Sequence, residues 1–116
     1  MTPLDETIRP DSSVVQQLLA ASELPQQLKM LRETNLLHTE GLMSLLEIAA
    51  EWVRTNPGQA RQIAIICTNA AAEADIKTVL PRADYIRAQT HALAGEFEPA
   101  QRLIEQAREG YLALGQ

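Results

Sequence analysis

Cys67, His38 and His91 are the side chains of this 116-residue chain that could serve as a nucleophile or a general base. A cysteine nucleophile needs a base within hydrogen-bond reach, and the only cysteine lies many positions from either histidine. Cys67 also belongs to an apolar helical stripe, a position that favours a buried structural thiol. One cysteine and two scattered histidines do not make the clustered ligand set of a metal site. The sequence therefore predicts no catalytic residue, no metal site and no cofactor.

The carboxylates are numerous, but their pattern is that of solvated helix faces. Glu105 and Glu109 stand four residues apart, with Arg102 and Arg108 beside them. General acid–base catalysis needs surroundings that shift the pKa of the group, and nothing in the sequence marks such a pocket. The glycines are isolated, so there is no glycine-rich loop for a phosphate. We therefore expect that the chain is not an enzyme.

Overall charge and hydropathy narrow the classes of partner. Fifteen acidic and ten basic residues give a net charge of −5, whereas affinity for a nucleic-acid backbone rests on Lys and Arg. We expect no nucleic-acid partner, and a small helical transcription regulator stays an alternative. The chain has no apolar run long enough to span a membrane, and its N-terminus lacks the apolar segment of a secretory signal. A cytoplasmic protein without a membrane partner is the expectation.

The elements that position these residues are predicted by a ladder of small and apolar side chains that repeats after 40 residues. Each stripe follows the i, i+3, i+4, i+7 spacing of a helix with one buried face. The two stripes are Ala60, Ile63, Ala64, Cys67, Ala71, Ala74 and Ala100, Leu103, Ile104, Ala107, Tyr111, Leu114. A fixed period of this size is typical of stacked helical hairpins, which mostly act as binding scaffolds.

Apolar periodicity and the placement of prolines divide the chain into helices at roughly 12–21, 24–34, 40–54, 57–75, 80–94 and 97–113. No stretch alternates with the period of a strand, so we predict an all-α fold. Residues 1–11 form a flexible tail in this prediction, and 12–116 form one domain. The domain is a right-handed stack of three antiparallel hairpins, 12–38, 40–75 and 80–115, the first of them degenerate and at a shorter spacing.

The second full hairpin carries a pattern that resembles the tetratricopeptide repeat. That family has a small residue in its first helix, a turn of the form Gly-x-aromatic, and small residues in its second helix. The residues in these places are Ala88, Gly95, Phe97, Ala100 and Ala107. Those of the preceding repeat are Ile48, Pro57, Ala60 and Cys67. The longer period resembles the extended repeats of large bacterial regulatory proteins, including those beside CHAT domains.

The resemblance implies a non-catalytic module for protein–protein interaction or assembly, as a fragment or N-terminal region of a larger regulatory protein. In that family the first helix of each hairpin lines a groove that takes a protein or peptide. The corresponding residues here are Leu42, Leu45, Ala49, Trp52, Arg82, Tyr85, Gln89 and Leu93. Trp52 has a second interpretation, in which it fills the space between the helices at 12–21 and 40–54.

The last helix also predicts self-association. Terminal repeats of a helical array need a polar outer face, whereas this helix keeps apolar residues on more than one side. We expect a homodimer through Leu103, Tyr111, Leu112 and Leu114. A compact helical homodimer without a peptide groove is the alternative to the scaffold.

Overall fold

The chain folds into six α-helices in a computed structural model that describes residues 10–115. The helices are α1 (Ser12–Ala20), α2 (Leu24–Glu33), α3 (Thr39–Trp52), α4 (Pro57–Glu73), α5 (Leu80–Leu93) and α6 (Phe97–Ala113). No strand occurs between residues 10 and 115, and the predicted all-α class is confirmed. Most of the expected tail, residues 1–9, lies outside the described residues. Within the described range, no helix combines the length and hydropathy needed to cross a membrane.

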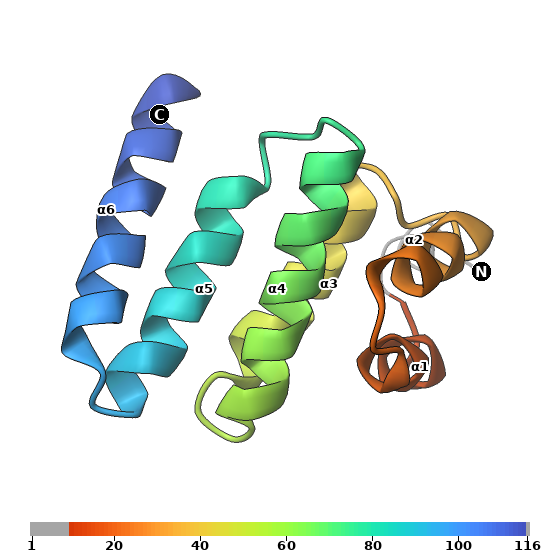
Figure 1. The fold of residues 1–116 in the computed structure, drawn as a ribbon, viewed down its shortest axis with the longest axis horizontal. Coiled ribbons are helices and arrows are strands. Elements are labelled where there is room, and N and C mark those ends of the chain that lie inside the picture. Colours follow the sequence, from red (N-terminus) through yellow and green to blue (C-terminus); the bar gives the residue numbers. More distant parts are fainter. Residues whose placement is uncertain (1–9, 116) are drawn as a thin grey trace, which may run out of the picture.

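The helices are stacked side by side. Helices α3 and α4 form one antiparallel hairpin, and α5 and α6 form a second beside it (Figure 1). Helix α5 packs mainly on α4 and also touches α3, which joins the two hairpins. Helices α1 and α2 lie on the other side of α4, with their axes turned away from the rest (Figure 1), and both contact α4. The molecule measures 42 × 31 × 31 Å, with its long dimension along the stack.

The second helix of each pair ends in the same way, and these ends fix the repeat length. The residues after α2, α4 and α6 have positive φ angles: Asn35 at 59°, Asp75 at 57° and Gly115 at 85°. A left-handed residue here lets the N–H groups beyond the helix bond to its last carbonyls. Their amides donate to Arg32, Ala72 and Leu112, respectively. Because positions 35, 75 and 115 are 40 apart, the period includes α2, and the shorter spacing expected for the first hairpin is wrong.

The first helices of the two full hairpins follow a different interval. Helix α3 begins at Thr39 and α5 at Leu80, an interval of 41 residues, whereas α4 and α6 begin at Pro57 and Phe97, an interval of 40. The cause is the turn within each hairpin, which has four residues at 53–56 and three at 94–96. Since one residue turns an α-helix by about 100°, positions 40 apart on α3 and α5 point in different directions.

Small side chains on α4 let its neighbours come close. Ala60, Ala64, Cys67, Ala70 and Ala71 are all 0% exposed. Short side chains at a helix contact reduce the distance between axes, which is how a core closes when aromatic residues make up only 3% of the chain. The buried position predicted for Cys67 is confirmed.

Candidate protein-binding surface

The three side chains with chemical potential are each held in a structural contact. Burial raises the pKa of the Cys67 thiol to about 12, and its Sγ lies 3.8 Å from the Leu42 carbonyl oxygen. His38 caps α3, since its Nδ1 accepts a hydrogen bond from the Gly41 N–H at 3.2 Å. His91 bonds to Glu96 through Nδ1 at 2.7 Å. Among residues 10–115, no three His, Cys, Asp or Glu side chains are grouped so as to hold a metal ion.

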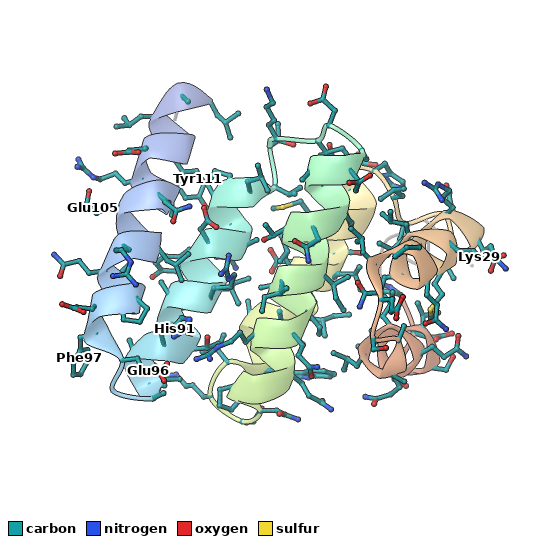
Figure 2. All side chains as sticks on the ribbon, in the orientation of Figure 1. Lys29, His91, Glu96, Phe97, Glu105 and Tyr111 are labelled. Carbon is teal, nitrogen blue, oxygen red and sulfur yellow. The ribbon has the colours of Figure 1, made fainter. Side chains whose placement is uncertain are left out.

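A polar network at the base of the stack ties α4 to the second hairpin. Arg61 Nε donates to Thr90 Oγ1 at 2.9 Å, and Arg61 Nη2 lies 3.5 Å from Glu96 Oε1. Figure 2 shows His91 and Glu96 together beside the turn that joins α5 and α6. The hydrogen bond from His91, helped by the charges of His91 and Arg61, lowers the pKa of Glu96. These residues fix the contact between hairpins, so we assign them a structural role.

Half of the predicted groove is buried. Leu42, Leu45 and Ala49 are at most 1% exposed and belong to the core. The prediction that they line a groove is therefore wrong, and the 41-residue interval between α3 and α5 explains why. Counted from the helix starts, these three residues correspond to Ala83, Ile86 and Thr90, which are also at most 1% exposed.

The predicted groove residues of α5 do lie at the surface. Tyr85 is 40% exposed and Leu93 is 58% exposed, and Gln89 between them is partly exposed. Arg82 Nη2 lies 3.9 Å from Glu47 Oε2 of α3. Trp52 packs against the hydrophobic core and keeps part of its surface exposed, so its environment combines the two interpretations. A groove that runs across both hairpins does not form from the predicted set.

Exposed apolar side chains concentrate on the last hairpin. Among the described residues, six large hydrophobic side chains are exposed, and five of them belong to α5 and α6. These five are Tyr85, Leu93, Phe97, Ile104 and Leu112, and the sixth is Ile65 on α4. Since single exposed hydrophobics are normal but clusters are not, the last hairpin is the candidate binding surface.

The members of this cluster on α6 share one face with Tyr85 of α5. Tyr85, Ile104, Tyr111 and Leu112 line a hollow of about 300 Å³, together with Ala107 and Arg108. Figure 2 shows Tyr111 extending from α6 toward α5, while Phe97 stands at the other end of α6. Phe97 is seven residues before Ile104, which places both on one side of the helix. We define the outer patch as Tyr85, Phe97, Ile104, Tyr111 and Leu112.

The outer patch overlaps only in part with the residues predicted to self-associate. Tyr111 and Leu112 belong to it, and Leu112 is 62% exposed. Leu103 is only 7% exposed, so its predicted place at a surface is wrong. Leu114 is partly buried and lines a different hollow. Ile104, which the prediction left out, is 46% exposed although it belongs to the same apolar stripe as Leu103.

A second hollow, of about 550 Å³, lies between the start of α5 and the end of α6. Its buried acid is Asp84, whose pKa is raised by burial although Arg87 opposes the shift from 3.8 Å away. Beside it, a Cβ on Gly110 would lie 2.7 Å from Cγ of Pro81. Because Asp84 already has an ionic partner and the helices touch at Gly110, we assign this hollow to the packing of α6 on α5.

No family model, curated protein or solved structure matches the chain. The outer patch, which comes from the geometry alone, is thus the feature on which a functional proposal rests.

Proposed function

We propose that the chain is a non-catalytic module that binds another protein chain through the outer patch of its last hairpin. The single observation behind this proposal is the concentration of five of six exposed large hydrophobics on α5 and α6. Apolar area that stays in water is unfavourable by roughly 25 cal/mol per Å². A protein partner that covers this area would gain that free energy on binding.

The shape of the patch favours a helical segment as the element that binds. Two helices flank a shallow apolar hollow, a geometry that accepts the apolar face of a third helix. Scaffolds of the tetratricopeptide type, which the last hairpin resembles, use helix surfaces in this way. Arg108 at the margin of the hollow is paired with Glu105 at 3.2 Å, and such polar rims are typical of protein interfaces.

A displayed library of amphipathic helical peptides, selected on the immobilised full chain, tests the proposal. Peptides that bind the wild type should lose roughly tenfold or more in affinity for Ile104→Asp, because a carboxylate would enter an apolar contact. Ile65→Asp is the matched control, since Ile65 is 38% exposed on α4, away from the patch. Selected peptides that bind Ile104→Asp as tightly as the wild type would place the site elsewhere. A library without binders would contradict the proposal itself.

A further inference from the structure

We infer that the outer patch binds a second copy of this chain, with the two α6 helices antiparallel about a two-fold axis near Ile104. This inference rests on the proposed function, because it names the occupant of the same surface. A two-fold interface requires that one surface be complementary to itself. Three features of α6 meet that requirement.

The first feature is a projecting side chain and a hollow on the same face. Phe97 is 70% exposed, the highest value among the exposed large hydrophobics of the described residues. The hollow lined by Tyr85, Tyr111 and Leu112 has a volume of about 300 Å³, enough for an aromatic ring. Phe97 and Leu112 are 15 residues apart, or about 22 Å along the helix, and their directions differ by about 60°. Both therefore face the same neighbour.

The second feature is the spacing about the centre. Ile104 lies seven residues after Phe97 and eight before Leu112, so it stands close to the midpoint. An antiparallel copy centred there places Phe97 over Leu112 of the second copy and Ile104 beside its own equivalent. The same register brings Gln101 opposite Arg108 of the second copy, where the amide oxygen can accept from the guanidinium. No like charges meet in the middle of the apolar stripe.

The third feature is the area. Side chains of this size present roughly 150–250 Å² each, so the exposed fractions of the outer patch amount to about 500 Å² of mostly apolar surface. A stable interface buries about 800 Å² on each partner, of which about three fifths is apolar. The patch and its polar margin are thus of the size that one side of a homodimer needs.

The residue types argue against another repeat stacked in the manner of α5. The positions of α4 equivalent to Ile104 and Tyr111 are Ala64 and Ala71, both 0% exposed beneath neighbouring helices. A helix that approached α6 as closely as helices approach α4 would collide with the larger side chains. A copy that places its own Ile104 and Phe97 between them fills this wider gap.

Sedimentation equilibrium of the full chain at concentrations from about one to a few hundred micromolar tests the dimer. We expect a reversible monomer–dimer equilibrium in which Ile104→Asp raises Kd roughly 100-fold or more, because two carboxylates would meet at the axis. Ile65→Asp should leave Kd within about twofold of the wild type. Circular dichroism shows that each variant is folded. A wild type that stays at 12.8 kDa throughout, or a dimer that Ile104→Asp leaves intact, overturns the inference.

Engineered cysteines test the register in a Cys67→Ala background. Ile104→Cys should form a disulfide between copies, because the two residues meet near the axis. Phe97→Cys and Leu112→Cys should each cross-link weakly alone and efficiently when the two variants are mixed. Efficient cross-linking of either variant with itself, without an increase on mixing, would exclude the antiparallel arrangement.

The two proposals fail in distinguishable ways. The dimer assay contains no partner peptide, and peptide binding is measured at concentrations below any dimer Kd. A monomeric chain whose selected peptides still depend on Ile104 would remove the second copy as occupant and leave the protein-binding function in place.

Discussion

Gly41→Ala should destabilise the protein even though alanine is the better helix former. Gly41 lies in the first turn of α3, where the segment 34–38 passes across the helix. A Cβ on this residue would lie 2.6 Å from the Leu36 Cα, closer than side chains are found. The segment is anchored, because the Leu36 N–H donates to the Leu31 carbonyl at 2.7 Å and the His38 N–H to the Leu36 carbonyl at 2.9 Å.

Two opposing contributions set the magnitude. Replacing glycine by alanine inside a helix gains about 1 kcal/mol. Overpacking against rigid atoms costs about 1–3 kcal/mol. Any retreat of α3 also strains the hydrogen bond from Gly41 N–H to His38 Nδ1, and such a cap contributes about 1 kcal/mol. The net effect is a loss of about 1–3 kcal/mol in the free energy of unfolding, which corresponds to a fall in Tm of about 4–10 °C for a domain of this size.

Thermal melts followed by circular dichroism provide the assay, and Gly58→Ala is the matched control. Gly58 is the second residue of α4, and a Cβ there would meet nothing within 4 Å. The same chemical change should therefore raise Tm by a few degrees at this position. If Gly41→Ala melts at or above the wild-type temperature, the close crossing of 34–38 over α3 is not present in solution.

Other perturbations test the core, the repeat positions and two carboxyl groups. Cys67 should resist thiol reagents until the protein unfolds, and Cys67→Ala should cost only about 1 kcal/mol, because a small side chain fits the site. Ala100→Leu should lower Tm more than Leu112→Ala, since Ala100 is 3% exposed and Leu112 is 62% exposed; thermal melts at low protein concentration rank them. Burial raises the pKa of Asp84, so its ionised form opposes folding: Asp84→Asn should raise Tm at pH 7, with a difference that fades as pH falls toward 3.8. Glu96 has a lowered pKa, so Glu96→Gln should lower Tm at pH 7, and this loss should disappear as pH falls below 4.5.

The helices were predictable because their signals are local. Pro25, Pro57 and Pro81 each stand in the first turn of a helix, where a missing N–H costs nothing. Gly95, with φ of 79°, ends α5 through hydrogen bonds from its own N–H to Ala92 and from the next N–H to the carbonyl of His91. Each of these features involves residues within one turn of one another, so the sequence contains the whole interaction.

The groove could not be predicted from the repeat period, because a period does not specify direction. The 40-residue interval holds for the helix ends at Asn35 and Asp75, yet α3 and α5 are 41 residues apart. A single additional residue in the turn at 53–56 rotates the register by about 100°. That rotation separates a fully buried Leu42 from a surface-exposed Arg82, although the two residues are 40 apart in the sequence.

The outer patch depends on how many neighbours a helix has, which no local pattern contains. Ile63 and Ala64 of α4 are both buried, because α4 lies between other helices. Their equivalents on α6 are Leu103, which is 7% exposed against α5, and Ile104, which is 46% exposed. The same stripe is therefore fully covered on one helix and half covered on the other. A change from small to large side chains at equivalent positions was the available signal, because a wider gap beside α6 calls for larger residues and for a partner that fills it.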